Sequence, residues 1–259
     1  RAQERDNAQR ARETMIEVHG ILAVRAQLRE GATRARCLYI QKGRRDARVN
    51  ELISLAREQG IRYQAVEAAW FRRRLKGDEL HQGVLLESQA VPLVREDEFF
   101  NMLTALTKPV TVLVLDGVTD PRNLGACLRT ANAAGVQAVI LPKRRSAPIN
   151  GIVLKTAQGG AESLRIVEVT NLARTLKRLA EAGLWLVGTD EDARIAYMDA
   201  NLDGDAVIIL GSEDKGLRRL TREACDQLVA IPMHGSVESL NVSVATGVIL
   251  FERVRQLAL

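Results

Sequence analysis

The stretch that decides the fold reads Ser239-Leu240-Asn241-Val242-Ser243-Val244-Ala245-Thr246-Gly247, and the apolar run 248–251 follows it directly. Two hydroxyls and a carboxamide alternate here with small apolar residues, and the pattern predicts a helix over 239–257. Unpaired buried amides and hydroxyls are costly. We therefore expect these polar groups to cap the helix, to bind a ligand, or to do both.

A short strand and a glycine-bearing loop precede this helix. Residues 228–231 are typical of a strand, and 231–238 read Ile-Pro-Met-His-Gly-Ser-Val-Glu. A helix N-terminus after such a loop offers unpaired N–H groups to a ligand. The loop lacks the spacing of Gly-x-x-x-x-Gly-Lys-Ser/Thr and of Gly-x-Gly-x-x-Gly. The sequence therefore carries no fingerprint of a nucleoside triphosphate or dinucleotide site here.

A second polar loop follows the predicted strand 206–210 and leads into a predicted helix over 217–225. It reads Gly211-Ser212-Glu213-Asp214-Lys215-Gly216-Leu217. Its glycines allow the backbone to approach a ligand closely. Glu213 precedes the helix, where the helix dipole favours a carboxylate whether or not a ligand is bound.

A third polar loop follows the predicted strand 110–115 and leads into a predicted helix over 123–134. The loop contains the turn-forming pairs Asp116-Gly117 and Asp120-Pro121. Arg129 lies inside the helix between apolar neighbours. Two interpretations explain this pattern equally well. The arginine is functional, or it is a surface residue whose methylene groups pack on apolar neighbours.

The surrounding elements alternate between short apolar strands and amphipathic helices. This order predicts a parallel sheet covered on both faces, with ligands bound beyond the carboxyl ends of its strands. The further strands are expected at 138–141, 164–169 and 184–188, and the further helices at 149–158 and 172–182.

The first ninety residues predict a smaller α/β unit. Helices are expected at 19–29, 48–59 and 67–75, and strands at 37–40, 61–66 and 83–90. Residues 1–13 are expected to form a polar extension. Residues 91–98 are rich in proline and acid, which is typical of a linker, and a short helix is expected over 98–106.

Composition excludes several classes of protein. No apolar run approaches the ~20 residues of a membrane span. Cysteines 37, 127 and 225 are widely spaced and odd in number, which argues against a disulfide framework and for a reducing, cytoplasmic compartment. Three histidines and no Cys-x-x-Cys pair argue against a metal site.

The net charge of +5 lies mostly in the first 100 residues, which favours either a polyanionic partner or solvated helix faces. Aromatic residues make up only 3%, which argues against a base-stacking surface for single strands.

The three loops together resemble the TrmH group of SPOUT RNA 2′-O-ribose methyltransferases. Asn123-Leu124-Gly125-Ala126-x-x-Arg129-Thr130 resembles the first motif of that group, Gly211-Ser212-Glu213-x-x-Gly216-Leu217 resembles the second, and the stretch from Ile231 to Ala245 resembles the third. The motifs occur in order and at suitable separations. The resemblance extends over nearly the whole chain from about residue 15.

The resemblance implies a fold that patterning alone does not. Residues 106–259 would form an α/β catalytic domain, a parallel sheet with a C-terminal trefoil knot (SPOUT). They would follow a small L30e-like α/β domain over 14–90, an RNA substrate-binding unit that the stretch 81–84 fits, and a linker over 91–105. Family members are homodimers. Two positions depart from the family pattern: Leu22 replaces an expected His, and Asp214 stands where Gly is common.

The resemblance also implies a chemistry, in which S-adenosylmethionine donates a methyl group to a ribose 2′-hydroxyl of RNA. The substrate that the resemblance favours is a guanosine of 23S rRNA. Arg129 would be central. Because a guanidinium stays protonated, we expect it to stabilise charge rather than to remove the proton, and the proton acceptor is left open. Asn123 and Glu213 would orient Arg129 and the ribose, while Ser239 and Asn241 would order the loop and contact substrate. The cofactor would contact Gly188, Thr189, Gly211, Ile231, Met233 and Leu240.

Two alternative functions stay open on the sequence alone. One is 2′-O-methylation of another RNA, a tRNA or a different rRNA site, although the two-domain layout favours rRNA. The other is a non-catalytic RNA-binding or ribosome-assembly protein, although all three motifs keep their polar residues.

Overall fold

The computed structural model describes residues 15–30, 34–75 and 81–258, so the predicted polar extension over 1–13 lies outside the described residues. The chain divides into two compact units. One comprises residues 1–91 with 149–162, and the other comprises 92–148 with 163–259.

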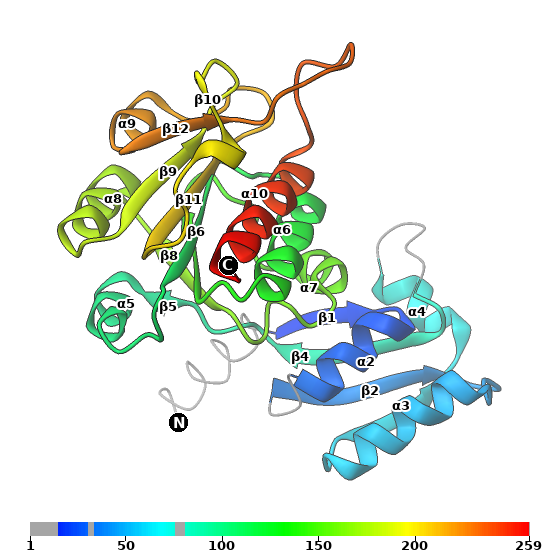
Figure 1. Ribbon diagram of the computed structural model, residues 1–259. Helices are drawn as coiled ribbons and strands as arrows, with labels where there is room; N and C mark the ends of the chain where they lie inside the picture. Colours follow the sequence, from blue (N-terminus) through cyan, green and yellow to red (C-terminus); the bar gives the residue numbers. More distant parts are fainter. Residues whose placement is uncertain (1–14, 31–33, 76–80, 259) are drawn as a thin grey trace. The chain divides into compact units, whose positions relative to one another are not determined.

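The first unit contains a mixed sheet. Within the described residues this sheet has four strands in the order β1-β4-β2-β3, and only β2 and β3 run parallel. Figure 1 shows its elements: β1 (Met15–His19), β2 (Ala35–Gln41), β3 (Arg62–Val66), β4 (Val84–Gln89), α2 (Ile21–Glu30), α3 (Ala47–Glu58), α4 (Ala68–Arg74) and α7 (Gly151–Ala157).

Strand β1 is absent from the sequence-based expectation, which began a helix at His19. That boundary is wrong, because His19 ends β1 and the helix α2 begins at Ile21. Gly20 lies between the two elements with φ +92°, a left-handed conformation that glycine adopts without strain and that breaks the helical path.

The second unit is built on a parallel sheet, as predicted. Its described strands are eight in the order β10-β12-β9-β11-β6-β7-β8-β5, and every neighbouring pair is parallel. They are β5 (Val94–Arg95), β6 (Thr111–Asp116), β7 (Ala138–Pro142), β8 (Arg165–Val169), β9 (Trp185–Thr189), β10 (Ile195–Ala196), β11 (Ala206–Gly211) and β12 (Gln227–Ala230).

Helices cover both faces of this sheet, which is why its central strands read as continuous apolar runs. Helices α5 (Glu96–Leu103), α8 (Leu172–Glu181) and α9 (Arg219–Glu223) lie on one face. Helices α6 (Pro121–Ala133) and α10 (Val242–Leu257) pack side by side on the other (Figure 1). A core between α5, α8 and the sheet includes the fully buried Phe99, Val114, Leu176 and Leu186.

The segment expected as a linker, 91–105, contains strand β5 and helix α5. Phe99 and Leu103 of α5 are buried in the core of the second unit. Glu96 anchors the start of the helix, because its Oε1 accepts hydrogen bonds from Thr175 Oγ1 at 3.1 Å and Arg178 Nη1 at 3.0 Å. The helix expected over 98–106 therefore begins two residues earlier, at Glu96.

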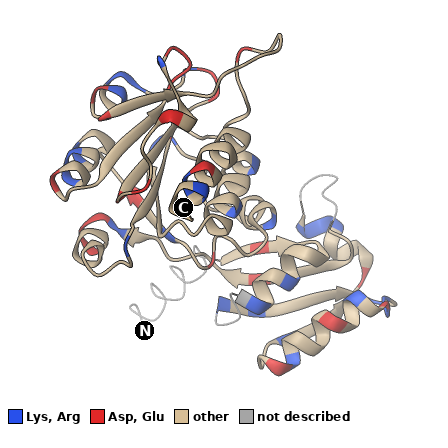
Figure 2. Cartoon of the chain, in the orientation of Figure 1, with Lys and Arg blue, Asp and Glu red and all other residues tan. Residues whose placement is uncertain are grey.

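Basic side chains are prominent on helix α4 of the first unit and on α8 of the second (Figure 2). None of the helices in the described ranges is long and apolar enough to span a bilayer. The trefoil knot implied by the resemblance stays a prediction.

Candidate active site

The three polar loops meet beyond the carboxyl ends of β6, β11 and β12. Asn123 Nδ2 donates a hydrogen bond to Glu213 Oε1 at 2.7 Å. Asn241 Nδ2 donates to the same oxygen at 2.6 Å and to Asn123 Oδ1 at 3.1 Å. Three side chains that the sequence singled out, up to 118 residues apart, therefore form one hydrogen-bonded cluster.

Asn241 is the N-cap of helix α10. Its Oδ1 accepts from Ser243 N at 2.9 Å and from Ser243 Oγ at 2.6 Å, so the helix begins at Val242 rather than at Ser239. A carboxamide offers two donors and one oxygen with two lone pairs. Protein partners occupy all four side-chain positions, so the side chain of Asn241 orders the site. Ser243 donates to the cap instead of being the cap.

Glu213 is held by the loop that carries it. The loop closes on itself, because Ser212 N donates to Gly216 O at 3.1 Å and Gly216 N donates to Ser212 O at 2.9 Å. A Cβ on Gly211 would lie 2.0 Å from the carbonyl carbon of Gly216, so only glycine fits there. Val242 N adds a third, longer donor to Glu213 Oε1 at 3.4 Å.

A cavity of about 500 Å³ opens beside this cluster. Its volume lies within the range of small-molecule and cofactor sites. Seven of the residues predicted from the sequence line it: Thr189, Gly211, Glu213, Ile231, Met233, Ser239 and Leu240. Apolar wall is added by Leu210, Leu217, Val229 and Val242.

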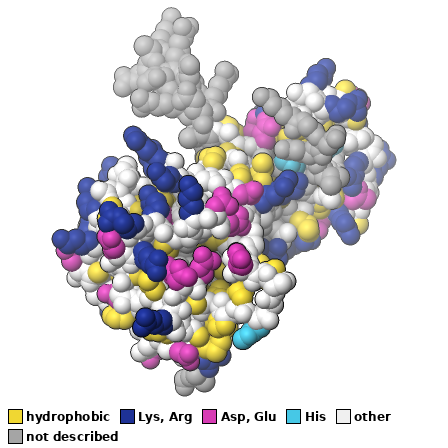
Figure 3. All heavy atoms as spheres, turned by 90° about the horizontal axis from the view of Figure 1, so that it is seen from above, with side chains coloured by type: hydrophobic (Ala, Val, Ile, Leu, Met, Phe, Trp, Pro, Cys, Tyr) yellow, Lys and Arg dark blue, Asp and Glu magenta, His cyan; other side chains and the backbone are white. Residues whose placement is uncertain are grey.

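Sequence reasoning missed the acidic part of the cavity wall. Asp190, Glu191 and Asp192 line it together with Asp214 and Glu238. Arg222 pairs with Asp190, its Nε lying 3.1 Å from Asp190 Oδ2. The sequence did contain a signal for these residues, because 190–192 directly follow the carboxyl end of strand β9, where ligands bind in parallel sheets. Two cations, Lys215 and Arg222, also line the cavity, but the acidic side chains outnumber them, which favours a cationic ligand. Figure 3 shows acidic and basic side chains together on one face of the molecule.

Four predicted residues lie outside this cavity wall: Asn123 and Asn241, which belong to the hydrogen-bonded cluster, and Gly188 and Arg129. Gly188 is buried, and a Cβ there would lie 2.6 Å from Cys225 Sγ and 2.8 Å from Leu217 Cδ1. Glycine at 188 therefore permits close packing behind the cavity. Arg129 is exposed on helix α6 and is not among the residues that line the cavity.

The two cysteines of the second unit are poor bases and nucleophiles. Burial raises the pKa of Cys127 to about 11 and that of Cys225 to about 12, so both stay protonated near neutral pH. Over the described part of the chain, no group of three or more His, Cys, Asp or Glu side chains is placed to hold a metal ion.

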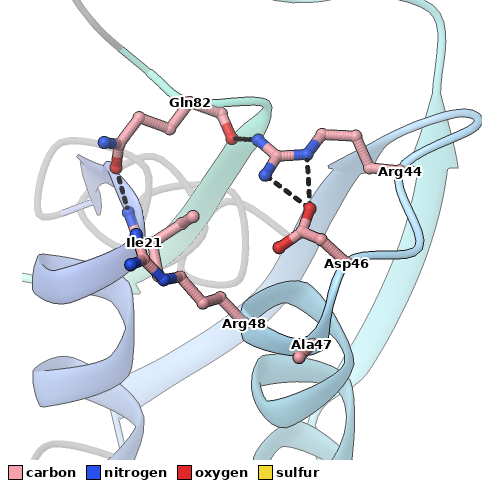
Figure 4. A pocket seen from close by; sticks show the side chains of 6 residues that line it. All are labelled: Ile21, Arg44, Asp46, Ala47, Arg48 and Gln82. Carbon is pink, nitrogen blue, oxygen red and sulfur yellow. Dashed lines mark hydrogen bonds and ion pairs between the residues drawn. The ribbon is translucent and has the colours of Figure 1, made fainter.

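The first unit has a shallower hollow of its own, shown in Figure 4. Arg44 contacts Gln82 O and binds Asp46 Oδ2 through Nε at 2.9 Å and Nη2 at 2.6 Å. Gln82 Oε1 accepts from Ile21 N at 2.8 Å and so caps helix α2. Arg48 also lines the hollow. Leu22, where the family pattern has His, is 54% exposed on α2.

Fold and site together define a SpoU-type RNA methyltransferase. The profile of the SpoU rRNA Methylase family matches residues 110–251, and the profile for RNA 2′-O ribose methyltransferase substrate binding matches residues 18–93. The chain belongs to the SpoU rRNA Methylase family.

Individual relatives agree with this assignment. The chain is 48% identical to the 23S rRNA (guanosine-2′-O-)-methyltransferase RlmB of Pseudomonas syringae pv. tomato, over 92% of this chain and 95% of that one. The crystal structure of an RNA 2′-O ribose methyltransferase is 25% identical with TM-score 0.78, covering 95% of this chain and 90% of that one. The SpoU methyltransferase AviRb of Streptomyces viridochromogenes, in complex with AdoMet, shares the fold at 24% identity and TM-score 0.75, covering 96% and 92%.

Proposed function

We propose that this chain is an S-adenosylmethionine-dependent RNA 2′-O-ribose methyltransferase whose substrate is a guanosine of 23S rRNA. The observation that carries the proposal is the cluster of Asn123, Glu213 and Asn241 beside a cavity, in a member of the SpoU rRNA Methylase family. The relative at 48% identity is named for that reaction.

The cavity fits the cofactor chemically. S-adenosylmethionine carries a sulfonium and an ammonium group, and acidic side chains at 190–192, 214 and 238 line the cavity. Ile231, Leu240 and Met233 supply apolar wall for its adenine. Gly211, where a Cβ would clash with the loop backbone, lets that loop close tightly at the end of β11. The fold neighbour AviRb has been solved with AdoMet.

When bound, the cofactor supplies an electrophilic methyl group to the reaction. The chain must hold the ribose oxygen in line with that methyl, and positioning of this kind supplies much of the rate. Asn241 and Asn123 hold Glu213 through Oε1. Among the described residues no hydrogen bond reaches Glu213 Oε2, so this oxygen is free for the substrate. Ser239 lines the cavity and contacts substrate or cofactor.

The first unit serves as the RNA-binding part. Its match to the substrate-binding profile and the arginines of its hollow support this role, because phosphate contacts dominate affinity for RNA. Leu22 is an exposed position of α2, and it puts an apolar side chain where the family pattern has an imidazole.

A homodimer through helices α6 and α10 completes the proposal. Val244 and Phe251 of α10 are 51% and 50% exposed and lie seven residues apart, on one helix face. Exposed apolar side chains in such a row mark an interaction surface. Arg129 lies on one stripe of α6 with the exposed residues 122 and 133 and the half-buried residue 126. Because Arg129 lies outside its own cavity wall and, in the described structure, makes no hydrogen bond to the cluster of Asn123, Glu213 and Asn241, we place its action on the ribose across the dimer interface.

Light scattering tests the dimer. The wild type is expected at twice 28.5 kDa, and Val244→Asp with Phe251→Asp is expected to give monomers. Leu220→Asp, at a residue 53% exposed on α9, is the matched control and should leave the dimer intact. A monomeric wild type contradicts the dimer.

Mixing two inactive variants tests the placement of Arg129. If Arg129 acts across the interface, mixed dimers of Arg129→Ala and Glu213→Gln hold one intact site. About a quarter of wild-type activity then returns after exchange of subunits, by simple counting of symmetric interfaces. If Arg129 acts in its own chain's cavity, no activity returns.

The main function is tested by methyl transfer to RNA. Purified protein with labelled S-adenosylmethionine should methylate 23S rRNA, and mapping of 2′-O-methyl groups in RNA from a deletion strain should show one guanosine lost. Methylation of tRNA alone would replace the substrate by the first alternative. A protein that binds cofactor and RNA without transfer would be the binding protein of the second alternative. The cytoplasmic location stays a prediction.

A further inference from the structure

Asp116 is a buried carboxylate at the carboxyl end of β6 that is not part of the cavity wall. Its side chain is fully covered, and its backbone pairs in register with Gly211 at the end of β11. A buried carboxylate is strongly unfavourable unless several donors satisfy it. The identity of its donors therefore indicates what Asp116 holds in place.

All side-chain contacts of Asp116 in the described structure come from one short segment 102 to 105 residues away. Arg218 reaches Asp116 Oδ1 with Nε and Nη2, both at 2.6 Å. Thr221 Oγ1 donates to Oδ2 at 2.6 Å, and Arg218 N adds a long contact to Oδ2 at 3.4 Å. Thr221 is 2% exposed, so this bond is shielded from water.

The anchored segment directly follows the loop 211–217, which carries Glu213 and forms part of the cavity wall. Backbone pairing between β6 and β11 holds the entrance of the loop at Gly211. The side chain of Asp116 holds its exit at Arg218. Asp116 of β6 therefore holds both ends of the loop, one through its backbone and the other through its side chain. The next residue, Gly117, keeps close to the same loop, because a Cβ there would lie 3.4 Å from Ser212 Cβ.

We propose that Asp116 is a positioning residue for the proposed methyl transfer, and that it acts by fixing Glu213 and the adjoining wall of the cofactor cavity. The proposal rests on the proposed function for its assay. Asp116 contributes no atom to the cavity wall, so its influence reaches the site through loop 211–217. Cofactor affinity and the rate of transfer should both depend on it.

The test compares Asp116→Asn with Asp205→Asn. Asp205 lies just before the amino end of β11, accepts from Val110 N at 2.8 Å and pairs with Lys108 at 2.8 Å, so it is a satisfied acid at the opposite end of the same strands. Calorimetry with S-adenosylmethionine and no RNA should give at least a tenfold weaker Kd for Asp116→Asn. The control should stay within twofold, although both variants lose thermal stability.

A double-mutant cycle with Glu213 separates positioning from general destabilisation. Single-turnover rates with labelled methyl are measured for Asp116→Asn, Glu213→Gln and the double variant. If Asp116 acts through Glu213, Asp116→Asn lowers the rate at least tenfold in the wild type and less than twofold in the Glu213→Gln background. Equal effects in the two backgrounds overturn the proposal.

Thr221→Val provides the test should Asp116→Asn not fold, since it removes one bond to Asp116 and keeps the ion pair. It should weaken cofactor binding at least threefold, and an unchanged Kd overturns the proposal. So does an Asp116→Asn variant that matches Asp205→Asn in melting temperature and in Kd. A wild type that binds S-adenosylmethionine but methylates no RNA refutes the proposed function instead, and the calorimetric comparison still decides the role of Asp116.

Discussion

The two ends of strands β6 and β11 use charged side chains in opposite ways. At the amino end the guanidinium of Arg253, 1% exposed, donates to Thr111 Oγ1 at 2.8 Å, to Val110 O at 2.9 Å and to Leu202 O. At the carboxyl end Glu213 is held through one oxygen only, beside a cavity of about 500 Å³.

The difference teaches how one sheet serves stability and function. Arg253 is enclosed by the chain's own carbonyl and hydroxyl groups, so its guanidinium is not available to a ligand. At the carboxyl end the loops diverge toward helices on both faces and leave space between them. Polar groups there are ordered by one another, and part of their hydrogen-bonding capacity is left for a ligand. Four substitutions can break or sharpen this comparison.

The largest effect is expected from Glu213→Gln. The amide nitrogen or oxygen must replace a carboxylate that accepts from both Asn123 and Asn241, so the cluster rearranges. We expect kcat for methyl transfer to fall about 100- to 1000-fold, the size typical for loss of a preorganised polar group. Glu223→Gln, on α9 and paired with Arg219, is the control and should keep wild-type kcat. Equal turnover in both variants would remove Glu213 from the site.

The next effect is expected at the amino end, from Arg253→Met. Removing the guanidinium leaves Thr111 Oγ1 and Leu202 O without their donor, whereas Val110 O keeps the bond from Ala206 N. The free energy of unfolding should fall by about 3 kcal/mol, measured by urea denaturation, while the Kd for S-adenosylmethionine changes less than twofold. Arg255→Met removes a guanidinium that is 57% exposed and leaves Glu252 the bond from Gln256 Nε2, so it should cost below ~1 kcal/mol. Tenfold weaker cofactor binding with full stability would contradict the contrast between the two ends.

Gly211→Ala and Gly204→Ala place the same methyl group at opposite ends of β11. At 211 the Cβ would lie 2.0 Å from Gly216 C, so the loop must move, whereas at 204 no heavy atom lies within 4 Å. We expect Gly211→Ala to weaken S-adenosylmethionine binding at least tenfold, about 1.4 kcal/mol, with Gly204→Ala at wild-type affinity. Calorimetry measures the Kd for S-adenosylmethionine in both variants, and similar values would contradict the prediction.

The smallest effect concerns pH. The hydrogen bond from Lys108, with help from Val110 N, holds the pKa of Asp205 below its ordinary 3.8. A lowered folded-state pKa stabilises the protein above the unfolded pKa, and this contribution is lost as pH falls through the folded value. Thermal melts from pH 6 to about pH 2 should show acid destabilisation that is smaller in Asp205→Asn. If the melting temperatures of both proteins fall equally as the pH is lowered, this prediction is wrong.

Local patterns predicted the parallel sheet because each central strand is buried on both faces and therefore reads as an unbroken apolar run. Strands β5 and β10 were not predicted, because two residues are too few to show a pattern. The loops that carry residues 123, 213 and 241 were visible because each follows an apolar strand, and the family resemblance then singled out these three residues. Asp190 to Asp192 stand in the same position and were overlooked.

The sequence by itself therefore determined the alternation of strands and helices, the family, and which loops carry chemistry, since these depend on neighbours along the chain. Only the tertiary structure decided that the side chain of Asn241 is saturated by protein partners and that Gly188 lies close to Cys225 and Leu217. It alone revealed that Asp116 anchors the loop of Glu213 from 102 residues away. Such roles depend on which groups meet after folding, and a hydrogen bond between distant segments leaves no periodic trace in either one.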